Sequence, residues 1–81
     1  MTESAITDAV FRRLKSIAPE ASPQEVAPGE NFREALDIDS FDFLNLMIGL
    51  HEDLGVDIPE SDYGKLTTLA DVVSYLSSRV A

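Results

Sequence analysis

The stretch Leu36-Asp37-Ile38-Asp39-Ser40-Phe41-Asp42-Phe43-Leu44 lies at the midpoint of the 81-residue chain and predicts the start of a helix. Asp39 and Asp42 stand three residues apart, the spacing of a capping box with Asp in place of the commoner Glu. With Asp39 as the N-cap, its carboxylate accepts from the free amides of the first turn and Ser40 points outward. Ser40 could itself be the cap, but Phe43, three residues later, cannot return the bond. We therefore expect Asp39 to cap the helix and the Ser40 hydroxyl to form no capping hydrogen bond.

An uncommitted serine at a helix N-terminus is a favourable place for a phosphodiester, because free amides and the helix dipole favour an anion there. Three segments, Asp39-Ser40-Phe41-Asp42, Gly55-Val56-Asp57-Ile58-Pro59-Glu60 and Leu66-Thr67-Thr68-Leu69, together resemble acyl carrier proteins. The resemblance covers roughly residues 32–76. It implies that Ser40 carries 4′-phosphopantetheine, whose terminal thiol holds acyl groups as thioesters.

The resemblance also implies a set of partners. A phosphopantetheinyl transferase would move the group from coenzyme A to Ser40 and release adenosine bisphosphate. Acyl-loading and acyl-processing enzymes with basic docking surfaces would then use the carrier, whose chemistry belongs to them and to the prosthetic group, so we expect no enzyme activity in the chain itself. The residues that we expect to dock these partners are Asp39, Phe41, Asp42, Leu44, Ile48 and Glu52.

The chain departs from the family pattern at a few places. Asp37 stands where the family usually has glycine, Phe41 where leucine is usual after the serine, and Asn45 where an acid is common. The Gly-Gly pair that precedes the serine in peptidyl carriers is missing, which disfavours that class. Fatty-acid, polyketide and related biosynthesis remain open as pathways.

Acidic residues are concentrated in the middle of the chain. The formal net charge is −9, from 15 acids and 6 bases. Ten of the acids and a single base, Arg33, lie between residues 30 and 62, whereas five acids and five bases lie elsewhere. This segment excludes nucleic acid as the expected ligand and is complementary to basic protein surfaces. A solvated face without a partner is the alternative interpretation.

Length and composition predict one domain, spanning residues 1–81, and we expect it to act as a monomer. The absence of cysteine excludes a disulfide framework and a thiolate metal site. The first five residues contain no basic region and no long apolar run, so we expect no signal peptide, no membrane segment and a cytoplasmic location.

Apolar residues at helical spacing predict long helices over residues 3–18, over residues 39–54 and from residue 68 to about Val80, with a short turn of helix over residues 60–66. A proline-marked loop covers residues 19–38, and Val26, Phe32 and Leu36 could anchor it to the core. No segment alternates with period two. We therefore predict an all-α fold, a small four-helix bundle of three long helices and one short helix with a long first loop.

The helix over residues 39–54 has two apolar stripes. Five residues fit a core face: Phe43, Leu46, Met47, Leu50 and Leu54. The second stripe, Phe41, Leu44 and Ile48, is surplus to a simple bundle, so it is a candidate docking surface. The alternative is that it packs under the long loop. The basic residues Arg12, Arg13 and Lys15 are interpreted as a solvated helix end.

Competing chemistries fit poorly. The segment from Asp37 begins like a calcium loop, but it has Asp42 where glycine is required and Ile48 where glutamate is required. His51 is the only histidine, so we expect a partly exposed helix residue and no metal site. An unmodified acidic helical bundle that only binds partner proteins remains the alternative function.

Overall fold

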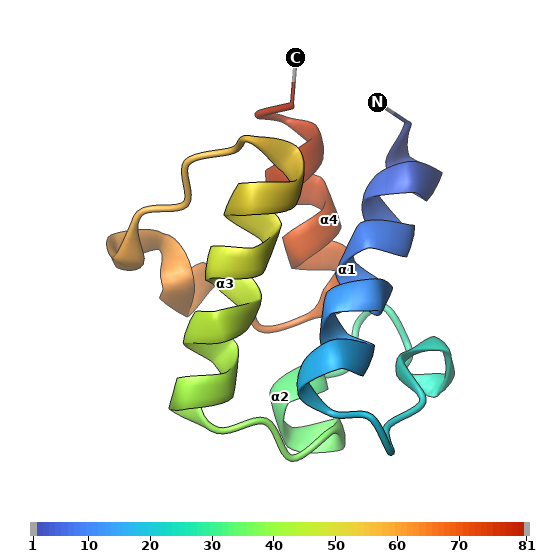
Figure 1. The fold of residues 1–81 in the computed structure, drawn as a ribbon. Helices are drawn as coiled ribbons and strands as arrows, with labels where there is room; N and C mark the ends of the chain where they lie inside the picture. The colour runs from blue at the N-terminus through green and yellow to red at the C-terminus, as the bar shows by residue number, and fades with distance from the viewer. Residues whose placement is uncertain (1, 81) are drawn as a thin grey trace.

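Helices are the main regular structure of the computed structural model, which describes residues 2–80 (Figure 1). In chain order the elements are α1 (Glu3–Ile17), η1 (Pro23–Glu25), α2 (Phe32–Ala35), α3 (Ser40–Leu54), η2 (Glu60–Lys65) and α4 (Leu69–Ser77). Over residues 2–80 no strand forms, and one isolated bridge joins Asn31 to Thr68. The prediction of a small all-α bundle is confirmed.

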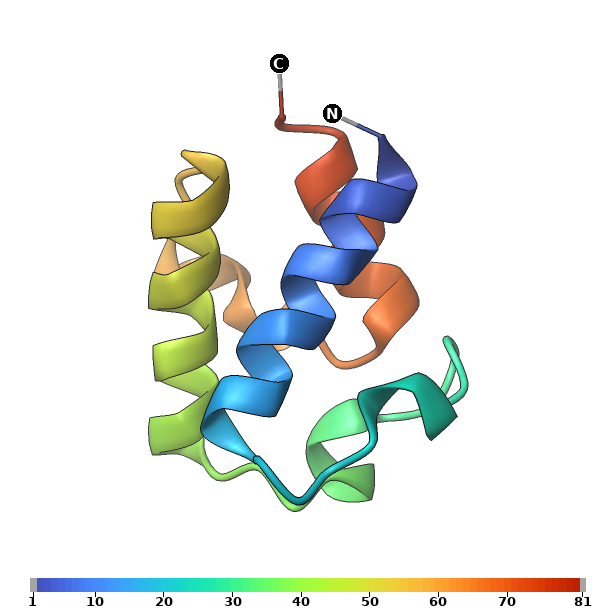
Figure 2. The ribbon, with the colours of Figure 1, turned by 45° about the vertical axis from the view of Figure 1, so that its right-hand side comes forward.

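Helix α1 packs against both α3 and α4 and runs in the opposite direction to each (Figures 1 and 2). The N-terminal end of α3 therefore lies at the same end of the bundle as α2 and the long loop. The predicted stripes supply the core, and the buried residues of these three helices include Ile6, Val10, Leu14, Phe43, Leu46, Met47, Leu50, Leu69, Val72, Val73 and Leu76. Burial of this apolar area is the main stabilising contribution to the fold.

The long first loop contains more regular structure than the sequence predicted. Helix α2 begins after Asn31, whose Oδ1 accepts from the amides of Arg33 and Glu34 at 3.0 and 3.1 Å. Phe32 is fully buried and its amide donates to the carbonyl of Thr67 at 3.2 Å. Val26 is also buried, as expected for an anchor. These contacts attach the loop to the core and to the segment that precedes α4.

Helix α4 is shorter than its apolar stripe indicated. Thr68 caps it, with Oγ1 accepting from the Asp71 amide at 3.0 Å. The helix ends at Ser77, and Val80 packs against the core from beyond the helical turns. The prediction that the helix extends to Val80 is therefore wrong by three residues, although the contact of Val80 with the core is real.

Candidate functional site

The N-terminus of α3 has the predicted cap. Asp39 Oδ1 accepts from the Asp42 amide at 2.8 Å, and Asp39 has extended backbone angles, as an N-cap should. The return bond of a full capping box, in which the Asp39 amide would donate to the Asp42 carboxylate, does not form between these two described residues. Ser40 is exposed, and its hydroxyl makes no hydrogen bond within residues 2–80. The site therefore presents a free hydroxyl at the first helical position.

The turn that leads into α3 explains the unusual residue at position 37. The Asp37 amide donates to the Glu34 carbonyl at 3.3 Å, and the Ile38 amide donates to the Arg33 carbonyl at 2.8 Å. These two bonds form a Schellman motif at the end of α2. Such a motif requires a left-handed residue, and Asp37 has φ of +54°. Glycine adopts this conformation without strain, so aspartate here carries a conformational cost.

A small cavity of about 350 Å³ lies beside the serine. It is lined by residues of α2, α3 and η2, namely Arg33, Ser40, Phe43, Leu44, Glu60, Tyr63 and Gly64. Phe43 forms its inner wall, with the Tyr63 ring edge-on at 5.6 Å between centroids. The Arg33 guanidinium carbon lies 4.4 Å from the centroid of the Phe43 ring. The cavity thus opens next to the hydroxyl and has both aromatic and charged walls.

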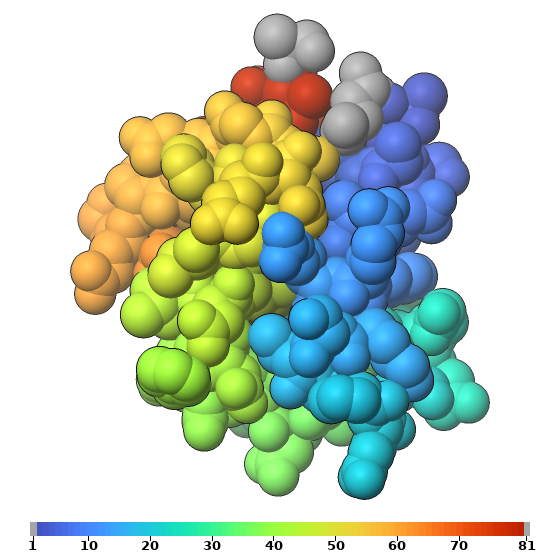
Figure 3. All heavy atoms as spheres, in the orientation of Figure 1, coloured from blue at the N-terminus to red at the C-terminus, as the bar shows by residue number. Residues whose placement is uncertain are grey.

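The second stripe of α3 is exposed. Phe41, Leu44 and Ile48, called here the α3 strip, have 70, 42 and 46% of their surface accessible. They are the large exposed hydrophobic residues of the described part of the chain. The strip does not pack under the long loop, so the alternative interpretation is wrong. Figure 3 shows the outer surface of α3, in green to yellow, beside that of α1. The docking role of the strip stays a prediction.

The acids that were predicted to dock partners differ in their surroundings. Asp39 contributes its carboxylate to the helix cap, whereas Asp42 has no cation within 4.0 Å among residues 2–80. The Glu52 carboxylate lies 4.0 Å from the Arg13 guanidinium and its side chain is 65% exposed. Asp39 and Glu52 are exposed and Asp42 is half-buried, and Glu52 also faces α1.

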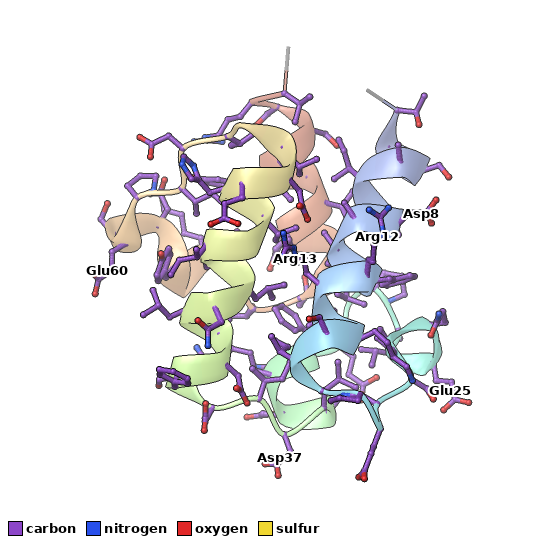
Figure 4. The ribbon with its side chains drawn as sticks, viewed as in Figure 1. Asp8, Arg12, Arg13, Glu25, Asp37 and Glu60 are labelled. Carbon is purple, nitrogen blue, oxygen red and sulfur yellow. The ribbon has the colours of Figure 1, made fainter. Side chains whose placement is uncertain are left out.

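Arg13 connects α1 to α3, which the sequence did not predict. Its Nε and Nη2 each donate to the Asp53 carboxylate at 2.7 Å. These hydrogen bonds lower the pKa of Asp53 and raise the pKa of Arg13. Figure 4 shows Arg13 between the two helices. The interpretation of this basic segment as a solvated helix end is therefore wrong for Arg13, because the pairing depends on how two separate helices face each other.

A second polar contact holds η2, which forms one wall of the cavity. The Tyr75 hydroxyl of α4 donates to Asp62 Oδ2 at 2.6 Å, and Lys65 lies 3.3 Å from the same carboxylate. The bond from Tyr75 is the main reason that the pKa of Asp62 is lowered, while burial raises the pKa of Tyr75. The Arg79 guanidinium stacks on the Tyr75 ring at 3.7 Å. The bond between Tyr75 and Asp62 thus joins α4 to η2.

Other candidate chemistry is limited. His51 Nδ1 lies 2.8 Å from the Val56 carbonyl oxygen, a contact that closes the end of α3. Among residues 2–80 no cluster of three or more His, Cys, Asp or Glu side chains is arranged to hold a metal ion. No helix in the same range is both long enough and apolar enough to cross a membrane.

Comparison with known proteins agrees with this geometry. A sequence model of the family described as "Phosphopantetheine attachment site" matches residues 8–76. The acyl carrier protein of Thermosynechococcus vestitus is 33% identical over 75 residues, which cover 89% of this chain and 93% of that protein. That of Wolinella succinogenes is 33% identical over 73 residues, covering 86% and 96%. The mitochondrial acyl carrier protein of Dictyostelium discoideum is 33% identical over 76 residues, covering 94% and 62%.

Proposed function

The chain belongs to the acyl carrier protein family, whose members carry a covalently attached 4′-phosphopantetheine, and on that premise we propose that Ser40 is the attachment residue. Members of this family are carriers and not catalysts, so the chain is not an enzyme. The observation that carries the proposal is the exposed Ser40 hydroxyl at the start of α3, which has no hydrogen-bond partner within residues 2–80 because Asp39 supplies the cap.

The residues around Ser40 fit such a group. Asp39 accepts from the amides of Asp42 and Phe43. The amides of Ser40 and Phe41 form no hydrogen bond within the described residues. Free amides at the N-terminus of a 15-residue helix favour a phosphodiester. The cavity beside the hydroxyl leaves room for the chain that follows the phosphate. When bound, the group supplies a thiol that carries acyl groups as thioesters.

The attachment is a phosphoryl-type transfer to the serine. Ser40 Oγ loses its proton and forms a new bond to phosphorus, while the pyrophosphate bond of coenzyme A breaks and adenosine bisphosphate leaves. The acceptor hydroxyl needs to be accessible to the transferase, and the exposed position of Ser40 satisfies this requirement. The free first-turn amides would stabilise the charge on the phosphate oxygens during the transfer.

Partner enzymes would dock on the surface of α3. The α3 strip offers apolar contact area, and Asp39, Asp42 and Glu52 border it. Acids of this kind steer an encounter with a basic surface, and the apolar residues stabilise the complex after contact. We assign the partners to two classes, a phosphopantetheinyl transferase and the enzymes that load and process acyl groups in fatty-acid, polyketide or related biosynthesis. The cytoplasmic location expected from the sequence stays a prediction, and one relative is mitochondrial.

The proposal is tested by the mass of the intact protein after incubation with a phosphopantetheinyl transferase and coenzyme A. The unmodified chain should gain one phosphopantetheine, Ser40→Ala none, and the control Ser16→Ala, at an exposed position of α1, one. Because the Ser40 hydroxyl is not the cap, Ser40→Ala should change the free energy of unfolding by less than about 0.5 kcal/mol.

Two results would contradict the proposal. If Ser40→Ala still gains the group, the attachment residue is another one. If the unmodified chain gains nothing, the chain acts as an acidic bundle that binds partners without a prosthetic group.

A further inference from the structure

Arg33 is a base without a carboxylate partner in the most acidic part of the chain. It is the single base among ten acids between residues 30 and 62. No carboxylate in residues 2–80 lies within 4.0 Å of its guanidinium, and its side-chain nitrogens make no hydrogen bond there. The residue is nevertheless half-buried. The five N–H donors of the guanidinium therefore have no acceptor among the side chains and backbone of residues 2–80.

The position of this guanidinium is defined by the fold. The side chain lies over the face of Phe43 at 4.4 Å, a cation–π contact. The backbone of Arg33 is held at both ends, because its amide donates to Asn31 Oδ1 and its carbonyl accepts from the Ile38 amide at 2.8 Å. The backbone of Arg33 is therefore held by the same Schellman motif that directs the chain into α3, and the contact with Phe43 places the guanidinium.

This position is next to Ser40. The two residues line the same cavity of about 350 Å³. Phe43, which Arg33 covers, follows Ser40 by three residues on α3, so its ring and the serine hydroxyl lie on one side of the helix, one turn apart. Glu60 also lines the cavity, but Figure 4 shows its carboxylate directed away from the bundle. The guanidinium thus has access to groups attached to the serine.

A phosphodiester on Ser40 would supply the acceptor oxygens that this guanidinium lacks within the described residues. Its two free oxygens match the planar fork of an arginine, which forms two parallel hydrogen bonds to phosphate. The modification also adds one negative charge close to Asp39 and Asp42, where acids already repel one another. A cation beside the phosphate would offset this repulsion.

We propose that Arg33 binds the phosphodiester formed on Ser40 and so positions the attached arm along the cavity between α3 and η2. This inference rests on the proposed attachment at Ser40. It makes Arg33 a positioning residue that the attachment motif itself does not contain, and it gives the cavity a role in orienting the prosthetic group.

The test compares the apo and holo forms of the full chain, prepared with a transferase and coenzyme A. The first measurement is the NMR signal of the Arg33 side-chain Nε–H, which should shift on modification, whereas that of Arg12, an exposed base on α1, should not. The second is the difference in melting temperature between holo and apo forms for the unmutated chain, Arg33→Gln and the matched control Arg12→Gln. Arg33→Gln should lower the melting temperature of the holo form, relative to that of the apo form, by about 2 °C or more. Arg12→Gln should leave this holo–apo difference unchanged.

The outcomes separate the two proposals. Normal mass gain with an unshifted Arg33 Nε–H signal, or with the same holo–apo difference in Arg33→Gln and Arg12→Gln, overturns the role of Arg33 but leaves Ser40 as the attachment site. Absence of any mass gain in the unmutated chain overturns both the attachment at Ser40 and the role of Arg33. If Arg33→Gln does not fold, Arg33→Lys, which keeps the charge but lacks the fork, should show a partial loss, and the Nε–H signal of the unmutated chain still decides.

Discussion

The Arg13 side chain of α1 lies directly over Gly49 of α3. A Cβ atom at position 49 would stand 2.7 Å from Arg13 Cδ and 2.8 Å from its Nε, closer than atoms pack. The absence of a side chain at Gly49 therefore lets the guanidinium cross α3 and reach Asp53 with two 2.7 Å hydrogen bonds. The Arg13–Asp53 ion pair between the two helices therefore depends on the absence of a side chain at Gly49.

Replacing Gly49 with alanine should separate the contribution of helix propensity to stability from the contribution of the Arg13–Asp53 ion pair. Alanine in a helix interior is favoured over glycine by about 1 kcal/mol, whereas ion pairs between exposed side chains contribute little. We expect Gly49→Ala to increase the free energy of unfolding by up to about 1 kcal/mol, measured in urea, while displaced Arg13 lets the pKa of Asp53 return towards its ordinary value.

The matched variant is Arg13→Gln, which should raise the pKa of Asp53 without any gain in stability. If Asp53 titrates in Gly49→Ala as it does in the unmutated chain, the guanidinium has moved aside and kept its partner, and the proposed dependence on Gly49 is wrong.

The sequence was sufficient for the long helices because their limits are local. Asp39 caps α3 as the Asp39–Asp42 spacing predicted, and Gly55, with φ of +67°, ends it. Helix α2 was missed because four residues contain too few turns for a periodic pattern. The one available signal was the spacing of Asn31 and Glu34, which is typical of a helix start.

The candidate site was predictable only in part. The free Ser40 hydroxyl follows from local capping, and the exposure of the α3 strip follows from the width of a core face. In contrast, the Arg13–Asp53 pair and the Arg33–Phe43 contact join elements distant in the chain or in separate helices. Their existence depends on packing angles that no local pattern encodes.

Asp37 offers a second prediction. Its φ of +54° is unfavourable for residues with a Cβ atom, although aspartate tolerates it better than most. Asp37→Gly and Asp37→Ala remove the same charge, so they form a matched pair. We expect Asp37→Ala to be less stable than Asp37→Gly by about 1 kcal/mol in urea unfolding. Equal stabilities would mean that the turn leaves the left-handed conformation when the side chain changes.

A third prediction concerns salt. Three of the ten central acids, Glu52, Asp53 and Asp62, have a cation within 4.0 Å, and the other seven have none within residues 2–80. Salt screens their repulsion over about 10 Å at 0.1 M. We expect added salt, and divalent cations more strongly, to raise the melting temperature of the isolated protein.

The same salt should weaken association with a basic partner, because there it screens an attraction. A melting temperature that stays level or falls between low and moderate salt would show that the acids do not repel one another appreciably in the folded state.

The bond between Tyr75 and Asp62 predicts a pH dependence. The folded state lowers the pKa of Asp62 from its ordinary value of 3.8, chiefly through this hydrogen bond. A lowered carboxyl pKa contributes stability above the ordinary value, and that contribution is lost as pH falls through the folded value. Tyr75→Phe should therefore be less stable than the unmutated chain at pH 7, and the difference should shrink as the pH falls below about 4.

Tyr63→Phe is the control, because the Tyr63 hydroxyl makes no hydrogen bond within the described residues. Tyr63→Phe should be nearly as stable as the unmutated chain at pH 7 and at pH 3. A constant difference between Tyr75→Phe and the unmutated chain from pH 7 to pH 3 would show that the Tyr75–Asp62 bond does not couple folding to this carboxyl.

The last prediction separates docking from packing on α3. Ile48 is 46% exposed and lies in the α3 strip, two turns beyond Ser40, so it is the residue of the strip farthest from the attachment chemistry. We expect Ile48→Ser to change the free energy of unfolding by less than about 1 kcal/mol, as at other exposed positions. It should weaken the affinity of the transferase for the apo carrier by about 1 kcal/mol or more, roughly fivefold, because a truncated contact residue loses buried apolar area in the complex.

Ile17→Ser provides the opposite case, since Ile17 is half-buried against the core and lies on α1, outside the strip. It should lower the stability and leave the affinity unchanged. Unfolding in urea and transferase binding, measured on the same two proteins, therefore give a crossed pattern if the strip is a docking surface. If Ile48→Ser instead loses stability and keeps its affinity, Ile48 contributes to the core and the docking surface lies elsewhere on the acidic face.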